Sequence, residues 1–230
     1  MASPQPGPST RSDAPSSESE GEDVYVPRHL STEEVLRNWN LARVVRTLGS
    51  NEQCVTFAED NGMVPTLKIC RTHRVPMRLS TFTNKSFGSW FCGKGGCRQK
   101  SKITRTKGTF FENIKIDLVH VFYLIYAFSN KWPYDIVINE DPYKDEKQQC
   151  LSRTTICDWY NYCRQAIVTY QLEKNTVEEK IVQVDESKFG KRKYDKGCHT
   201  EVEKLWRRHI TMFKKDAFME VIKAINYVYK

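Results

Sequence analysis

The chain has 230 residues, of which 36 are Lys or Arg and 28 are Asp or Glu, so its formal net charge is +8. This length is ample for one or two domains with a buried core. The longest apolar-rich run, residues 116–128, contains Asp117 and His120 and is too short to cross a bilayer. Composition therefore argues against a membrane protein with helical spans, and the charge favours a polyanionic partner.

The charge is unevenly distributed along the chain. Residues 1–23 hold five acidic residues, one Arg and no aromatic residue, and we expect residues 1–30 to be a disordered acidic tail. Residues 68–115 hold twelve basic residues and one Glu, and residues 188–215 hold ten basic and three acidic residues. Each basic block indicates either a surface for phosphate or an ordinary solvated face.

Residues 31–66 are expected to form a small helical segment. Ser31 and Glu34 have the spacing of a capping box at the start of a helix whose apolar residues extend to Val45. A second short helix is predicted over residues 51–60. After this segment the pattern changes to short β-like pieces rich in Gly and basic residues.

Cysteine and histidine residues form the most specific chemical pattern in the chain. Two residues separate Cys70 from His73, and four residues separate Cys92 from Cys97. Two close pairs of such ligands match what tetrahedral Zn²⁺ needs from two turns joined by a β-hairpin. We therefore predict a zinc ribbon with a structural zinc ion over residues 67–108. The alternative is a set of free thiols and a surface histidine.

The remaining cysteines have no paired spacing. Because no basic segment followed by an apolar run begins the sequence, we do not expect secretion, and thiols or metal ligands are favoured over disulfides. We interpret these cysteines as packing residues. They are Cys54, Cys150, Cys157, Cys163 and Cys198.

The second half of the chain is predicted to be mostly helical. Residues 116–128 favour a core helix, residues 134–139 a short helix, and residues 154–170 a helix with apolar positions spaced by three and four. A strand is predicted over residues 180–184. A final, mostly helical stretch is predicted over residues 201–229.

Four segments of the chain share motifs with a known protein family. They read WFCGKGGCR with KGTFF at 90–111, LSRTTICDWYNYCR at 151–164, VQVDESKFGKRK at 182–193, and HTEVEKLWR at 199–207. Together they resemble Merlin-type transposases and their bacterial ISXO-like relatives. In that family the corresponding segments are the exit of the zinc ribbon, a helix-turn-helix recognition helix, the strand with the first catalytic Asp, and the helix with the third carboxylate.

The resemblance implies an α+β chain whose zinc ribbon precedes a helix-turn-helix DNA-binding segment over residues 109–172. It implies an RNase H-like core over residues 178–230, ending in a long helix, in an enzyme that cuts and pastes DNA in the nucleus. Asp185 and Glu203 would be its first and third ligands of Mg²⁺. Glu201 is a rival for the third role, and an ordinary strand-end or surface role is the alternative for both ligands.

The interval between Asp185 and Glu203 departs from the family pattern. An RNase H-like core needs two more strands, a crossover and the strand with the second Asp there, and a crossover alone takes about a dozen residues. Only residues 186–202 are available, and Asp195 is not expected to be the second ligand. The core is therefore predicted to be truncated and catalytically deficient. If the deletion is an error in the gene model, an active two-metal transposase is predicted instead.

The predicted partner is double-stranded DNA of transposon terminal inverted repeats, and a homo-oligomer is left open. The basic residues predicted to contact phosphate are Arg71, Arg74, Arg98, Lys100, Lys102, Arg105 and Lys107. The candidates for base edges are Arg153, Thr154 and Thr155. The alternatives are a helical bundle that contacts only protein and a domesticated zinc-dependent nuclear adaptor that recruits a partner through its acidic tail.

Overall fold

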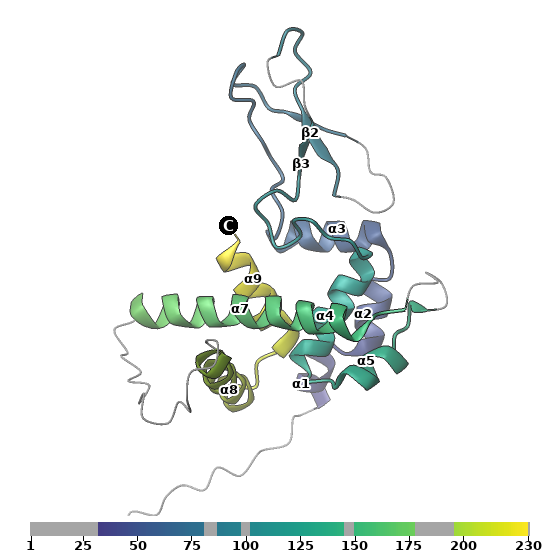
Figure 1. The fold of residues 1–230 in the computed structure, drawn as a ribbon, viewed down its shortest axis with the longest axis vertical. Helices are drawn as coiled ribbons and strands as arrows, with labels where there is room; N and C mark the ends of the chain where they lie inside the picture. Colours follow the sequence, from purple (N-terminus) through teal and green to yellow (C-terminus); the bar gives the residue numbers. More distant parts are fainter. Residues whose placement is uncertain (1–31, 81–86, 98–101, 145–149, 178–195, 230) are drawn as a thin grey trace, which may run out of the picture.

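A helical body and a small three-stranded sheet that projects from it make up the described part of the chain (Figure 1). The computed structural model describes residues 32–80, 87–97, 102–144, 150–177 and 196–229. The mixture of helices with one small sheet confirms the α+β class in its coarse form. The predicted acidic tail and the strand predicted over residues 180–184 lie outside the described residues.

The N-terminal segment forms three short helices, α1 (Thr32–Arg37), α2 (Leu41–Thr47) and α3 (Asn51–Asp60). The prediction of one helix extending to Val45 is wrong, because the helix ends after Arg37 and a separate helix, α2, begins at Leu41. The Asn40 side chain accepts a hydrogen bond from the backbone N–H of Arg43 at 2.8 Å and so begins a new helix. Helix α3 has the bounds that the sequence predicts.

Helix α4 (Leu118–Ser129) is the centre of the body. All twelve of its residues are buried, and it packs against α2, α3, α7 and α9. A helix that is apolar on every side is buried on every side, and this confirms the core helix predicted there. Among the described residues, no helix combines the length and the apolar character that crossing a membrane requires.

Helices α5 (Tyr134–Asn139) and α7 (Arg153–Val177) follow α4. The Ser152 hydroxyl accepts a hydrogen bond from the backbone N–H of Thr155 at 3.1 Å and so caps the N-terminus of α7. Residues 140–152 lie between α5 and α7, and residues 145–149 of this interval lie outside the described residues. The predicted helix-turn-helix therefore stays a prediction.

The C-terminal stretch forms two helices, α8 (Lys196–Met212) and α9 (Ala217–Val228), rather than the one long helix that was predicted. Lys214 has a left-handed backbone with φ of 48° at the break. Asp216 then caps α9, because its carboxylate accepts from the backbone N–H of Met219 at 3.0 Å. The other carboxylate oxygen of Asp216 accepts from the backbone N–H of Trp39, which links the two ends of the body.

The sheet consists of three short antiparallel strands in the order β1 (Arg78–Leu79), β2 (Ser89–Phe91) and β3 (Ile103–Thr104). Arg78 pairs with Phe91 across the first ladder, and Ser89 pairs with Thr104 across the second. Gly88 has φ of +82°, and a Cβ on it would lie 2.9 Å from the carbonyl oxygen of Ser80. The entry into β2 therefore needs glycine.

Candidate metal centre and basic pocket

The four predicted zinc ligands come together at one point in the projecting sheet region. Their ligand atoms all lie within 4.8 Å of one another. The sulfurs of Cys70 and Cys97 are 3.7 Å apart, and Nδ1 of His73 lies 3.9 Å from the Cys70 sulfur and 3.5 Å from that of Cys92. In a tetrahedral site with Zn–S bonds of about 2.3 Å, two sulfurs lie roughly 3.8 Å apart. The residues therefore fit a zinc ion.

Two tight turns position these ligands. In the first, the N–H of Cys70 donates to the carbonyl of Val75 at 2.9 Å, and the N–H of Arg74 donates back to the carbonyl of Cys70 at 2.8 Å. In the second, Gly96 has φ of +73° and nothing lies near the position of its missing Cβ. The pairing of β1 with β2 then holds the two turns together.

The electrostatics of the first turn favour a thiolate. The backbone N–H of His73, followed by that of Thr72, donates to the sulfur of Cys70 and lowers the pKa of this thiol to about 6, although burial opposes the shift. Thiolate is the form that binds a metal. A closed site with four protein ligands is structural rather than catalytic, so the expected role of the ion is to hold the ribbon together.

The packing of the ribbon supports such a role. Among the described residues, its separate hydrophobic cluster contains four buried side chains, with four partly buried ones packed against them. The buried ones are Cys70, Met77, Trp90 and Cys97, of which all but Met77 and Trp90 are predicted ligands. The main cluster of the body is much larger and includes all the apolar residues of α4. So small a core cannot offset the entropy cost of ordering its chain without a further crosslink. The metal is therefore expected to supply folding free energy to the ribbon.

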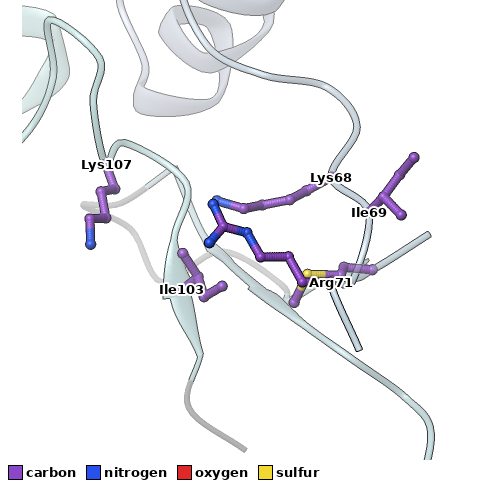
Figure 2. A pocket seen from close by; sticks show the side chains of 6 residues that line it. Lys68, Ile69, Arg71, Ile103 and Lys107 are labelled. Atoms are coloured by element: carbon purple, nitrogen blue, oxygen red, sulfur yellow. The ribbon is translucent and has the colours of Figure 1, made fainter. Parts of the chain in front are cut away.

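A basic pocket of about 260 Å³ lies beside the first turn of the ribbon. Lys68 and Arg71 come from the segment around the first ligand pair, and Lys107 comes from the turn after β3. In Figure 2 the charged ends of Lys68 and Arg71 point to the side of the pocket on which Lys107 lies. The other lining residues are apolar: Ile69, Met77 and Ile103. Among the described residues, no acidic side chain lines the pocket, so it presents a concentrated positive charge.

The residues that are predicted to contact phosphate differ in how exposed they are. Arg71, Arg74, Lys102 and Lys107 are exposed, whereas Arg98 and Lys100 lie outside the described residues. The prediction for Arg105 is wrong, because this side chain is only 2% exposed.

The buried guanidinium of Arg105 connects the ribbon to the helical body. It donates to the carbonyl of Pro65 at 2.7 Å and pairs with Glu59 of α3 at 2.5 Å. It also lies over the ring of Trp90, 5.8 Å from the centroid. Its charge is used inside the protein, so it is not available to a phosphate.

The predicted base-edge residues lie at the N-terminus of α7. Arg153 and Thr154 are exposed, and Arg153 forms an ion pair with Asp135 of α5. The hydroxyl of Thr155 lies 2.9 Å from that of Ser152, within the cap of the helix. These residues lie at the start of α7, which belongs to the helical body, whereas the strands of the ribbon project from that body (Figure 1).

The two predicted catalytic carboxylates differ in what the structure says of them. Asp185 lies outside the described residues. Glu203 on α8 accepts hydrogen bonds from Arg164 at 2.6 Å and from Arg207 at 2.8 Å. Arg207 also donates to the carbonyls of Phe128 and Ser129 at the end of α4, at 3.0 Å each. In this structure Glu203 therefore serves in a structural ion-pair network, and a metal ion would have to displace two arginines.

The arginines also control the ionisation of Glu203. Burial opposes its charged form, but the hydrogen bond from Arg164 and the charge of Arg207 outweigh burial and lower the pKa of the carboxyl. Sequence reasoning missed this network and missed Lys68 in the basic pocket. Lys68 stands two residues before Cys70 in the sequence, which was a usable signal. The partners of Glu203 gave no such signal, because Arg164 is 39 residues away.

Comparison of the chain with protein-family models, with curated proteins and with solved structures gave no match. The assignment of the site therefore depends on the ligand geometry and the charges described above.

The Cys92→Ser substitution tests the metal centre. The purified wild-type chain is expected to contain about one zinc ion, and the variant is expected to lose it because a hydroxyl is a poor replacement for thiolate. Metal analysis by mass spectrometry measures this directly. The control is Cys150→Ser, which changes an exposed cysteine outside the cluster and should keep its zinc. A wild-type protein that neither contains nor binds zinc would contradict the assignment.

The Glu203→Gln substitution tests the ion-pair network. Because Arg207 has only 11% of its side chain exposed, loss of the charge on Glu203 leaves a mostly buried cation unpaired, and we expect destabilisation of about 2–4 kcal/mol. Urea unfolding at pH 7, followed by circular dichroism, gives the free energy. Asp135→Asn is the control, since its pair with Arg153 is about two-thirds exposed on both sides and should contribute less than about 1 kcal/mol.

The same network predicts a pH dependence. The pKa of Glu203 is lowered in the folded state, so its contribution is fully present above the ordinary carboxyl pKa and is lost as the pH falls through the lowered one. The difference in unfolding free energy between wild type and Glu203→Gln should therefore shrink on acidification. An equal difference at neutral and at strongly acidic pH, or a cost no larger than that of Asp135→Asn, would contradict this role.

Proposed function

We propose that the chain is a transposase-derived DNA-binding protein, of the Merlin and ISXO-like type, whose zinc-stabilised ribbon grips the DNA backbone. Its target would be the terminal inverted repeats of a transposon in the nucleus, as the sequence resemblance implies. The observation that carries the proposal is the basic pocket beside the predicted zinc site. Lys68, Arg71 and Lys107 line it together, and no acidic side chain in the described part of the chain lies among them.

The chemistry of this pocket suits a phosphodiester. Three cations around one concavity attract a phosphate and release the counterions condensed on DNA, which is a main source of affinity for nucleic acid. The apolar residues Ile69, Met77 and Ile103 offer contact surface for an adjoining sugar. Further exposed basic residues on the ribbon, Arg74 and Lys102 among them, add to its positive surface.

The coupling to zinc follows from chain position. Lys68 and Arg71 flank the ligand Cys70, and their backbone is held by the hydrogen bonds of the first turn. If the metal is absent, this turn loses its anchor and the cations no longer share one pocket. DNA binding by the ribbon is thus proposed to require the metal, although no ligand of the metal touches DNA.

Catalysis of strand transfer is not part of the proposal. Helix α8 begins at Lys196 and carries Glu203 in its interior, so only residues 186–195 remain between Asp185 and this helix. An interval of this length does not accommodate two strands, a crossover and the further strand that would carry the second Asp. The involvement of Glu203 with Arg164 and Arg207 also supports a structural role.

Substitution of the pocket cations tests the proposed function. The triple change of Lys68, Arg71 and Lys107 to Ala should weaken binding to duplex DNA and reduce the slope of log affinity against log salt by about 2–3. Fluorescence anisotropy at several salt concentrations provides both quantities. The matched control changes three exposed bases of the helical body, Arg46, Lys131 and Lys144.

The control variant loses the same amount of positive charge but keeps the three cations of the pocket. Equal weakening of DNA binding in both triple variants would mean that net charge alone attracts DNA, and this would contradict a specific role of the ribbon. Zinc content should be unchanged in either variant, because neither removes a ligand.

The catalytic deficiency gives a separate test. The zinc-loaded chain, incubated with Mg²⁺ or Mn²⁺ and DNA that carries inverted repeats, should produce no nicked product on a denaturing gel. Cleavage that is lost in Asp185→Ala would overturn the deficiency and support an active transposase, while leaving the proposed role of the ribbon intact.

A further inference from the structure

A second concave site lies on the helical body and shares no lining residue with the ribbon pocket. It is a groove of about 560 Å³ between the loop at residues 109–116 and the first turns of α7. Thr155, Asp158, Trp159 and Tyr162 line it from α7. Their spacing of three, one and three residues places all four on one face of the helix. This face of α7 therefore forms one continuous side of the groove.

One wall of this groove is aromatic. The ring of Phe110 lies 5.5 Å from that of Trp159 and 5.5 Å from that of Tyr229, with interplanar angles of 67° and 71°. The ring of Tyr162 lies 5.8 Å from that of Trp159 at 89°. Adjacent rings therefore meet edge to face. Phe110 and Trp159 are 7% and 8% exposed, whereas Tyr162 is 47% exposed, so its ring is the one most open to a partner.

The charge of the groove is opposite to that of the ribbon pocket. The lining includes the carboxylates of Asp158 on α7 and Glu112 on the loop, both exposed, against the single ammonium of Lys115. Glu112 also accepts a hydrogen bond from the N–H of Gly108 at 2.8 Å, which holds its carboxylate near the loop. Two carboxylates disfavour a phosphate here, although the chain as a whole carries a net charge of +8.

We propose that this groove binds an alkylammonium side chain, that is, a lysine or methylated lysine of a protein partner. Aromatic faces attract such a cation through the ring quadrupole, and the effect grows when the cation is weakly hydrated. Asp158 and Glu112 supply the charge complementarity, and the volume accommodates a long side chain with its flanking backbone. The site is distinct from the proposed DNA-binding pocket of the ribbon, because the two share no lining residue, although Thr155 is also one of the residues predicted to contact base edges.

The experiment compares a charged and a neutral peptide of the same shape. The probes are a Gly/Ser nonapeptide with one central trimethyllysine and the same peptide with norleucine at that position. Binding to the zinc-loaded full chain is followed by NMR through the indole N–H of Trp159, which is identified from the spectrum of Trp159→Phe. The trimethyllysine peptide should shift this signal and bind at least about threefold more tightly than the norleucine peptide.

Two exposed positions provide variants that should still fold. Asp158→Asn and Tyr162→Ala are each expected to weaken binding of the trimethyllysine peptide by about threefold or more. Tyr227→Ala is the control, since this tyrosine is also exposed on the body but packs on Tyr170 outside the groove.

Three results would overturn the proposal. They are equal binding of the two peptides, an Asp158→Asn variant that binds as tightly as wild type, and failure of both peptides to move the Trp159 signal. Each of these outcomes leaves the DNA affinity of the ribbon untouched. Failure of the cation site is therefore distinguishable from failure of the proposed function.

Discussion

Three sulfurs and one imidazole meet at one point in a part of the chain whose described hydrophobic cluster is small. The ligand atoms of Cys70, His73, Cys92 and Cys97 lie within 4.8 Å of one another, while the strands they join are two or three residues long. Met77 and Trp90 are the other members of the ribbon's buried cluster. A bound zinc ion is worth on the order of 10 kcal/mol in small zinc modules, which is enough to order the ribbon. We propose that such a crosslink would fix the geometry of the basic pocket.

Two charged residues that were predicted to bind DNA or a metal ion instead form structural contacts between parts of the protein. Arg105 joins the ribbon to α3 through Glu59 and the Pro65 carbonyl. Glu203 orients Arg207, which satisfies the last carbonyls of the central helix α4. Both networks are mostly buried, where an unpaired charge is costly. A count of the basic residues in the sequence therefore includes charges, such as that of Arg105, that are not exposed at the surface.

The sequence was informative where a feature depends on local spacing. The ligand cluster and the bounds of α3 and α5 follow from residues close to one another in the chain. The breaks at Asn40 and Asp216 were missed, because each lies inside an otherwise helical pattern. Asp216 shows the reason: its carboxylate binds the N–H of Trp39, 177 residues away, as well as the helix that it caps. The burial of Arg105 likewise depends on Glu59, 46 residues away, and no local pattern reports such a contact.

The central claim is that zinc organises a ribbon whose cations hold DNA. The most direct measurement is the affinity of one preparation for duplex DNA with its metal present, after removal by a chelator, and after addition of one equivalent of Zn²⁺, with circular dichroism recorded at each step. The account predicts that binding is lost on removal and restored on addition, while the helical signal of the body, whose core is separate from that of the ribbon, changes little. DNA affinity that is unchanged in the metal-free protein would contradict it.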